Sequence, residues 1–245
     1  MTNGNIGHHI SGLFNKEMAD VHQKVLVMGG LVEQQIELAL LAFTSGDMEM
    51  AERVIHQDRE VNMMETAIDQ ECLRIFALRQ PAAFDLRFLL AVIKIIHELE
   101  RIGDKAKQIA KAAVGLAVDQ RRFPDYELKH MTGLVKGMLV DALNSFARMT
   151  LDNVLCITQR DENVDREYES ILRQLMTHMM EDSRHITRMM DMLWTVRALE
   201  RIGDHACYIC GHLVYAVKGE YVNAMDSQQL EKRLNPAYKG LYTQH

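Results

Sequence analysis

Apolar residues recur every three or four positions along most of the chain, whereas the alternation typical of a β-strand is scarce. Glycine, proline and polar clusters interrupt this periodicity at short turns. The interruptions divide the chain into six predicted helices, at residues 10–44, 47–79, 82–118, 126–151, 153–182 and 184–218. Long helices joined by short turns must pack antiparallel to bury their apolar stripes. The pattern therefore predicts an all-α protein.

An internal repeat divides these helices into two sets of three. The sequence Leu-Glu-Arg-Ile-Gly-Asp at 99–104 recurs without change at 199–204. A weaker match joins Asp-Arg-Glu-Val-Asn at 58–62 to Asp-Glu-Asn-Val-Asp at 161–165. Both matches occur in the same order and at nearly the same offset, which indicates a duplicated unit. We predict two tandem three-helix bundles of long antiparallel helices, at residues 1–121 and 122–219, followed by a C-terminal tail at 220–245.

Each unit carries acidic or amide side chains four residues apart on two successive helices. The first set is Asp58, Asn62, Glu100 and Asp104, and the second is Asp161, Asp165, Glu200 and Asp204. A rise of about 1.5 Å per residue places all of them roughly 26–36 Å from the turn that joins their two helices. They are therefore level in an antiparallel hairpin and lie on the flank of the apolar stripe. A mid-helix glycine, Gly103 or Gly203, leaves room between the acids.

Two like charges at this spacing repel by roughly 0.2–0.5 kcal/mol, so a cation or a basic neighbour is expected beside them. A cluster of oxygen ligands suits Mg, Mn, Ca or Fe and, less well, Zn. The eight residues are therefore candidate metal ligands, although Asn62 leaves the first set one charge weaker. The alternative is a solvated helix face on which Arg101 and Arg201 pair with Asp104 and Asp204.

Composition excludes several other classes. The 245 residues are 48% hydrophobic and 25% charged, with 3 prolines and a net charge of −6, as in a soluble globular protein rather than a nucleic-acid-binding one. No uninterrupted apolar run of about 20 residues predicts a membrane span, and the polar start lacks a signal-peptide pattern. The four cysteines form no disulfide framework, which favours the cytoplasm.

Other motifs add little chemistry. Cys207 and Cys210 form a single Cys-x-x-Cys without the second pair that a zinc site needs, so we expect them at or near a packing face and leave their role open. The chain has no Walker A loop, dinucleotide-binding turn or nucleophile elbow, which excludes an ATPase or a kinase at the level of motifs.

On the two repeat blocks and the acidic pattern, the chain resembles the PhoU family of accessory proteins of the phosphate-specific transport system. The resemblance covers almost the whole length and includes the segments at 9–12, 61–65, 79–81 and 85–87. It implies a fold of two three-helix bundles, often as a homodimer. It also implies that the acidic motifs named above hold metal ions, including multinuclear iron clusters.

The resemblance further implies a cytoplasmic negative regulator and not an enzyme. Such a protein restrains phosphate uptake and the phosphate-starvation regulon by linking the ATPase subunit of the phosphate ABC transporter to a membrane-bound sensor histidine kinase. It would meet the membrane only through these partners. The alternative is a metal-dependent hydrolase or oxidase that uses the same carboxylates to activate water.

Overall fold

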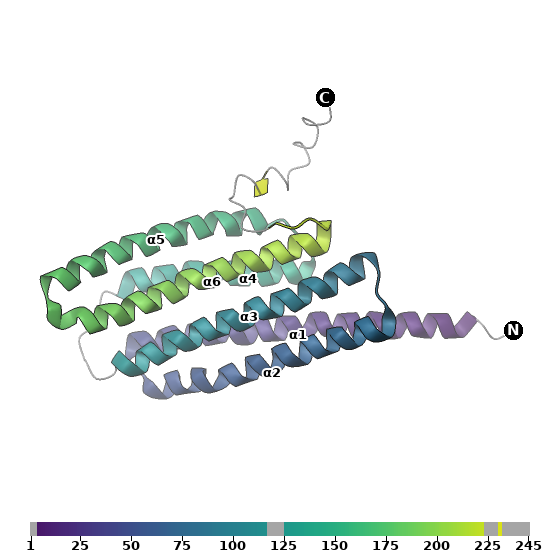
Figure 1. Cartoon of the computed structure of the whole chain (residues 1–245), viewed down its shortest axis with the longest axis horizontal. Coiled ribbons are helices and arrows are strands. Elements are labelled where there is room, and N and C mark those ends of the chain that lie inside the picture. The colour runs from purple at the N-terminus through teal and green to yellow at the C-terminus, as the bar shows by residue number, and fades with distance from the viewer. Residues whose placement is uncertain (1–3, 117–124, 223–229, 232–245) are drawn as a thin grey trace, which may run out of the picture.

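The computed structural model describes residues 4–116, 125–222 and 230–231, and all regular structure within these ranges is helical (Figure 1). The elements are α1 (Gly4–Ser45), α2 (Met48–Arg79), α3 (Ala83–Leu116), α4 (Asp125–Arg148), α5 (Val154–Glu181), a 3-10 turn η1 (Ser183–His185) and α6 (Ile186–Lys218). The six predicted helices are confirmed. The first begins at residue 4, six residues before its predicted start, and the other ends predicted within the described residues agree to within three residues.

Local chemistry explains where the helices start and stop. The Asp47 side chain accepts a hydrogen bond of 2.9 Å from the backbone N–H of Met50 and so caps α2, as predicted. Gly46, with φ of 72°, ends α1 in the left-handed conformation. The fourth helix ends at Arg148, three residues earlier than predicted, because Met149 also adopts a left-handed φ, of 50°.

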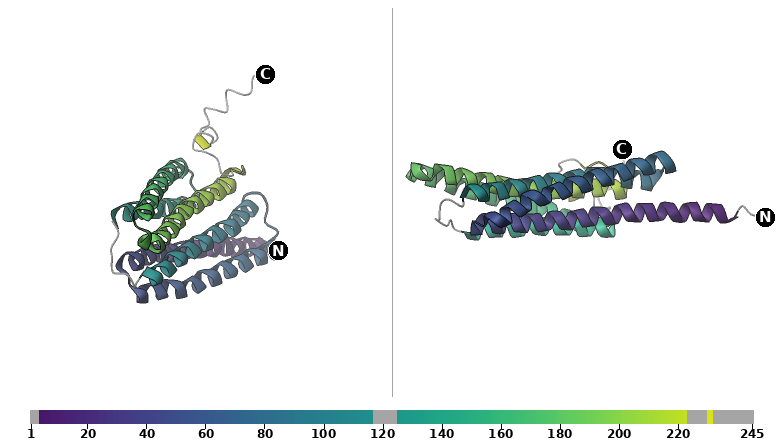
Figure 2. Two further views of the ribbon diagram at one scale, coloured as in Figure 1. Left: turned by 60° about the vertical axis from the view of Figure 1, so that its left-hand side comes forward. Right: turned by 90° about the horizontal axis from the view of Figure 1, so that it is seen from below.

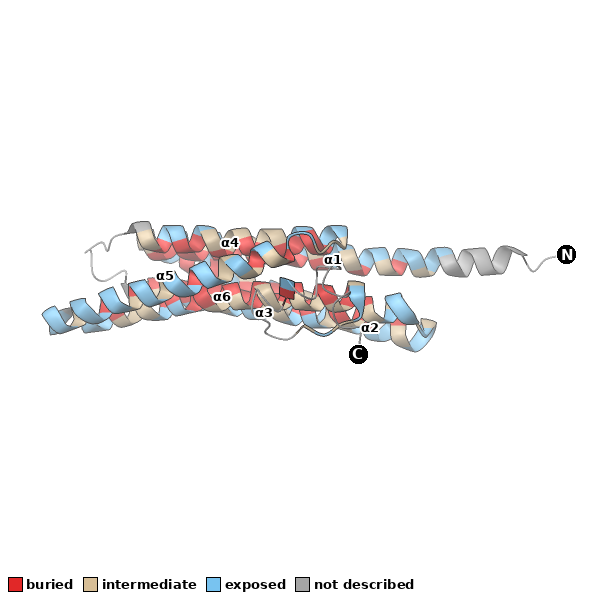
Figure 3. Ribbon diagram, turned by 90° about the horizontal axis from the view of Figure 1, so that it is seen from above, coloured by how far each residue is buried: buried red, intermediate tan, exposed pale blue. Residues whose placement is uncertain are grey.

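The helices form two layers (Figures 1 and 3). One layer holds α2, α3, α6 and α5 in this order, and the other holds α1 and α4. Helices α1, α2 and α3 make one bundle, and α4, α5 and α6 make the other. The predicted tandem three-helix bundles are therefore confirmed. Buried residues gather where the two layers meet, as Figure 3 shows.

The two bundles lie side by side (Figure 2) and are joined through equivalent helices, α3 with α6 and α1 with α4. The α3–α6 contact is the most extensive between any two helices and runs antiparallel: Arg87 of α3 lies beside Gly219, and Glu98 contacts His205. One apolar core continues through both bundles. The predicted boundary at residue 121 lies outside the described residues and stays a prediction.

Helix α1 packs against both other helices of the first bundle and against α4. By length and composition alone, its portion from Gly12 to Ser45 is apolar enough to cross a membrane. Half of the most apolar part of this segment is buried within the protein, and Val25, Met28 and Val32 are fully buried in the core. Its apolar stripe is thus explained by packing against α2, α3 and α4.

The chain turns back after α6. Gly219, with φ of 75°, ends the helix, and the backbone carbonyl of Val222 approaches Gly211 closely enough that a Cβ there would lie 2.8 Å away. Leu230 is buried against the core. Most of the predicted tail lies outside the described residues.

Candidate metal centre

The first acidic set lies where α2 faces α3. A Cβ added to Gly103 would lie 3.5 Å from Val61 Cγ1, so this turn of α3 packs directly on α2. One turn further along α3, the Lys107 ammonium lies 2.5 Å from Asp58 Oδ2 and 3.7 Å from Asp104 Oδ1. One cation thus contacts carboxylates from both helices. The predicted level pairing of α2 and α3 is confirmed.

Burial in this first cluster is uneven. Asp58 is only 2% exposed, and the Oδ1 atoms of Asp58 and Asn62 have no hydrogen-bond partner among the described residues. Burial raises the pKa of the Glu100 carboxyl, and the nearby charges of Asp104 and Glu65 add to this shift. The first cluster therefore keeps buried oxygens that receive no hydrogen bond, although the Lys107 ammonium contacts Asp58.

The expected i to i+3 pairing differs between the repeats. Arg101 donates its Nε–H to His97 Nε2 at 3.1 Å, and Lys107 pairs with Asp104 instead. The alternative of a solvated face on which Arg101 pairs with Asp104 is therefore not what the first repeat shows. In the second repeat, Arg201 contacts Asp204 at 2.5 Å, which is the pairing expected from the alternative reading of this face.

The second acidic set surrounds Gly203 at the α5–α6 contact. A Cβ on Gly203 would lie 3.0 Å from Asp161 Oδ1 and 3.7 Å from Val164 Cγ1, so the glycine makes room for the Asp161 carboxylate. Burial raises the pKa of Asp161 to about 7, and the neighbouring carboxylates contribute to the shift. These neighbours are Asp204, Asp165 and Glu200. All four predicted residues of the second repeat are thus brought together.

The cations near this cluster sit at its rim. Arg197 donates to Glu200 Oε1 at 2.9 Å, but Glu200 is 9% exposed and its Oε2 has no partner among the described residues. Asp161 Oδ1 is likewise buried without a partner there. Burial also raises the pKa of the Glu200 carboxyl, with Asp204 as the next contributor.

Three residues beside the acidic clusters were not predicted from the sequence: Lys107, Arg197 and Cys207. Burial raises the pKa of the Cys207 thiol, and the nearby charge of Asp161 adds to this shift. Cys210 is 2% exposed, as expected for a packing residue, and burial raises its pKa to about 12. The sequence did contain a pattern that could have identified two of them, because Lys107 and Cys207 each follow the repeated glycine by four residues.

The two clusters fit a cation unequally. Across the described ranges, no three His, Cys, Asp or Glu side chains stand ready as a ligand shell. Each cluster has two buried oxygens without a hydrogen-bond partner among the described residues, Asp58 Oδ1 and Asn62 Oδ1 in the first and Asp161 Oδ1 and Glu200 Oε2 in the second. In the first cluster, Lys107 already supplies the positive charge between Asp58 and Asp104. The two clusters therefore differ in their cations rather than in a preformed ligand shell, because only the first holds a lysine between its carboxylates.

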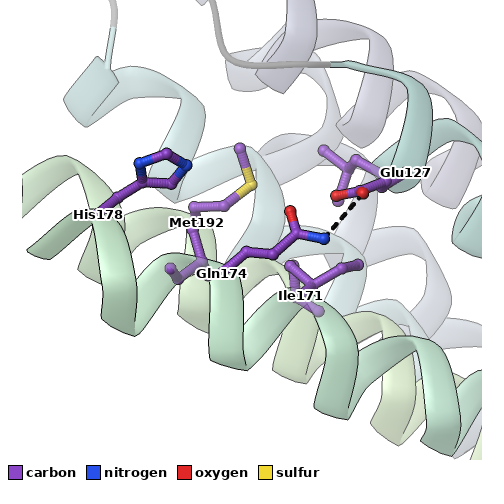
Figure 4. A pocket seen from close by; sticks show the side chains of 8 residues that line it. Glu127, Ile171, Gln174, His178 and Met192 are labelled. Atoms are coloured by element: carbon purple, nitrogen blue, oxygen red, sulfur yellow. Dashed lines mark hydrogen bonds between the residues drawn. The ribbon is translucent and has the colours of Figure 1, made fainter.

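A small pocket lies elsewhere in the second bundle, between the start of α4 and the α5–α6 hairpin (Figure 4). Its wall is largely apolar, with Leu128, Ile171 and Met192, and its edge carries a 3.0 Å hydrogen bond from Gln174 to Glu127. None of the eight candidate ligands lines it.

Comparison with known proteins agrees with this architecture. The model of the PhoU domain matches twice, at residues 25–113 and 128–212, which are the two repeats. A phosphate-specific transport system accessory protein PhoU from Serratia marcescens is 48% identical over 96% of both chains. The protein of that name from Escherichia coli K12 is 44% identical over 94% of this chain and 95% of its own.

Solved structures extend the similarity to the fold. The crystal structure of PhoU from Pseudomonas aeruginosa is 44% identical and superimposes with a TM-score of 0.81, covering 84% of this chain and all of that one. The phosphate transport system regulatory protein PhoU from Streptococcus pneumoniae is 34% identical with a TM-score of 0.80, covering 86% of this chain and 99% of that one. Since sequence and fold both match over both repeats, the chain belongs to the PhoU family.

Proposed function

We propose that this protein is an accessory regulator of phosphate-specific transport that lowers phosphate uptake and silences the phosphate-starvation response when phosphate is plentiful. The observation that supports this most strongly is the extent of the match. Relatives named as accessory proteins of that transport system align with nearly the whole chain, not with one repeat. Those names describe an accessory protein rather than an enzyme, which favours regulation over the metal-dependent hydrolase or oxidase.

The proposed regulator is a cytoplasmic homodimer that links the ATPase subunit of the phosphate ABC transporter to a sensor histidine kinase, and it meets the membrane only through these partners. Docking of this kind needs exposed apolar side chains on a polar surface. The bundle offers them at both hairpin tips, where Leu73 and Leu78 of α2 are 55% and 63% exposed and Met180 and Trp194 are 79% and 52% exposed.

The acidic clusters serve this regulator as its proposed cation sites. Asp161, Asp165, Glu200 and Asp204 would hold a divalent or iron cation such as Mg, Mn, Fe or Zn. Because Asp161 and Asp165 lie on α5 and the other two on α6, a bound ion would draw the two helices together by neutralising their carboxylates. The chain itself would supply the carboxylate oxygens, of which Glu200 and Asp204 now pair with Arg197 and Arg201 at the rim.

A genetic replacement experiment tests this function. In a bacterial strain that lacks its own family member, the wild-type chain should restore repression of a phosphate-responsive reporter at high phosphate and should co-purify with the transporter ATPase subunit. A double variant, Glu200→Gln with Asp204→Asn, should lose repression while keeping its helical content. The matched control is Glu52→Gln with Glu181→Gln, because both residues are exposed acids outside the two clusters.

The outcomes separate two parts of the proposal. A wild-type chain that leaves the reporter derepressed would contradict the regulatory function itself. A Glu200 and Asp204 variant that represses as well as the control would show that the acidic cluster is not the working surface.

A further inference from the structure

A row of cations runs along the outer face of α3, beside α6. Arg87, Lys94 and Arg101 follow one another at intervals of seven residues, and Lys105 comes four residues later. Seven residues make almost two helical turns, so the four side chains start from one side of α3 and span roughly 27 Å. Lys94 and Arg101 are exposed. The row therefore lies on the side of the four-helix layer that α1 and α4 leave uncovered (Figure 3).

These four cations lack acidic partners. No ion pair within the described residues involves any of them. Arg101 donates instead to His97, and the Arg87 Nε–H is buried without a hydrogen-bond partner in the same ranges. The acid that stands within the row, Glu98, contacts two histidines of α6 at 2.7 and 3.6 Å. The row thus carries positive charge that no carboxylate of the described chain pairs with, on a protein whose net charge is −6.

A row of aromatic side chains lies next to these cations on α6. Trp194, Tyr208 and Tyr215 are also spaced by multiples of seven residues, with Arg201 between the first two. Trp194 is 52% exposed, and both tyrosines are half-buried. The Lys94 ammonium lies 6.0 Å from the centre of the Tyr215 ring, which places the two rows side by side. We call the cation row of α3 and the aromatic row of α6 together the seam surface.

The seam surface has the composition of a protein-binding surface. Trp, Tyr and Arg are enriched where proteins bind one another, because they cover a large area and also donate hydrogen bonds. Unpaired cations add a preference for a partner of opposite charge. Carboxylates of a partner would neutralise the row on α3, and apolar side chains between them would cover the rings on α6. The occupant that fits this chemistry is an acidic protein segment.

The two acidic clusters limit how wide this occupant is. Asp104 lies towards α2, where it shares Lys107 with Asp58, and Asp204 lies towards α5, where its charge acts on Asp161. The positive strip is therefore bordered by carboxylates on both sides. An anionic membrane or a DNA duplex presents phosphates across a broader front and would place some of them against these carboxylates. A single protein segment about 10 Å wide meets the cations alone.

We propose that the seam surface is the docking site for an acidic segment of a partner protein, whose carboxylates pair with the cations of α3 and whose apolar side chains pack on the rings of α6. This inference rests on the docking part of the proposed function, and it adds the α3–α6 face to the hairpin tips as a contact area. Exposed charge pairs are screened by salt, so the association weakens as the ionic strength rises.

Binding of the full-length chain to its proposed partners tests this surface. The transporter ATPase subunit and the cytoplasmic part of the sensor kinase are immobilised separately, and affinity is measured by biolayer interferometry between about 50 and about 300 mM NaCl. Lys94→Gln with Arg101→Gln should weaken binding to at least one partner about tenfold at low salt and flatten its salt dependence. The matched control, Arg53→Gln with Lys111→Gln, removes two exposed cations outside the seam surface and should bind as the wild type does.

A zero-length cross-linker identifies the chemistry of the contact. A carbodiimide joins a lysine amine to a carboxylate only where the two touch, with loss of one water. Mass spectrometry of the complex should find amide bonds from Lys94 or Lys105 to Asp or Glu residues of the partner, and none from Lys111. Trp194→Ala should weaken binding without changing its salt dependence, because the indole ring contributes packing and not charge.

The outcomes separate the inference from the proposed function. A folded Lys94 and Arg101 variant that binds as tightly as the control, or cross-links that avoid both lysines, would overturn this inference alone. Tighter binding to phosphatidylglycerol vesicles or to a DNA duplex would overturn it in favour of those ligands. A change from dimer to monomer in the variant would assign the seam surface to a second copy of the chain. If the folded wild-type chain binds neither partner, the docking part of the proposed function fails, and the inference fails with it.

Discussion

Asp161 is a carboxyl group that the fold holds in unfavourable surroundings. It is enclosed against Gly203, its Oδ1 has no partner among the described residues, and three other carboxylates lie near it. Burial and these charges raise its pKa from 3.8 to about 7. The folded protein thus binds this proton more tightly than the unfolded chain does, so the free energy of unfolding should fall as the pH rises from about 3.8 to about 7.

Asp161→Asn should remove this dependence. In the presence of a chelator, we expect the variant to exceed the wild type in free energy of unfolding by roughly 1–3 kcal/mol at pH 8, and the difference to vanish near pH 4. Urea denaturation between pH 4 and pH 8 measures both slopes. Parallel stability curves for the two proteins would contradict the assigned surroundings of Asp161.

At the scale of residues, much of the candidate site could be predicted from the sequence. Spacing along each helix placed the four residues of the second repeat correctly, because rise and rotation per residue are nearly constant in a helix. It could not show that Lys107 reaches Asp58, or that Arg101 turns to His97 rather than to Asp104. A long side chain can reach more than one partner on its own or a facing helix. Which partner it contacts depends on tertiary packing, and the spacing of residues along one helix does not describe that packing.

Within the helices, the adjacent glycines of α1 have opposite roles. A Cβ on Gly29 would lie 2.5 Å from Leu143 Cδ2, so this glycine allows α1 to approach α4. A Cβ on Gly30 would meet nothing within 4 Å. Only the first of the two is required by packing, although both carry the cost of a flexible residue inside a helix.

The pair predicts opposite signs for the same substitution. Gly30→Ala should raise the free energy of unfolding by about 0.5–1 kcal/mol, because alanine favours the helix. Gly29→Ala should lower it by about 1–2 kcal/mol, since overpacking against Leu143 outweighs the same gain. Urea denaturation of the two variants side by side checks this. A destabilising Gly30→Ala or a stabilising Gly29→Ala would contradict the α1–α4 packing.

The helices themselves were predictable because each bundle buries a stripe with a period of three to four residues. Their ends were predictable where a residue type explains the stop, as at Gly46 and Pro81. The end of α4 was not, because it depends on Met149, a residue type with no preference for the left-handed conformation that it adopts. Here tertiary packing, not local propensity, sets the boundary.

Across the whole molecule, a carboxylate flanked by histidines joins the two bundles. Glu98 of α3 lies 2.7 Å from His205 Nδ1 and 3.6 Å from His212 Nε2 of α6. Burial opposes ionisation of Glu98, but hydrogen bonds and charge from the two histidines outweigh it and lower the pKa to about 2. The stabilisation from this lowered pKa is present above the unfolded value of 4.5 and is lost as the pH falls towards 2.

Glu98→Gln should weaken the junction between the bundles. We expect the variant to lose about 1–3 kcal/mol of unfolding free energy at pH 6, and the difference from the wild type to shrink between pH 4.5 and pH 2. Acid titration followed by circular dichroism measures this. A substitution of His97 is a suitable control. Its ion pair with Glu65 is 3.3 Å long and its side chain is 52% exposed, so losing this pair should change the free energy of unfolding little. A Glu98→Gln curve that stays parallel to that of the wild type would contradict the proposed electrostatic role.

The arrangement of the two bundles could not be predicted from the repeat. The duplicated pattern specifies the interior of each bundle, whereas residues that the pattern does not repeat make the junction. His22, Phe88 and Phe146 are an example, with stacked phenylalanine rings 6.0 Å apart and the His22 ring 4.8 Å from Phe146. Such contacts become visible only once both halves are folded.

The junction has the geometry of a symmetric dimer within a single polypeptide. Each half contributes the same two helices to the junction, and the α3–α6 contact runs antiparallel, as in an isologous interface whose twofold axis is perpendicular to the helices. Two identical subunits would have to carry the same residue at equivalent positions, whereas the halves of a single chain need not. Lys107 and Cys207, which stand at equivalent positions of the repeat, show this freedom.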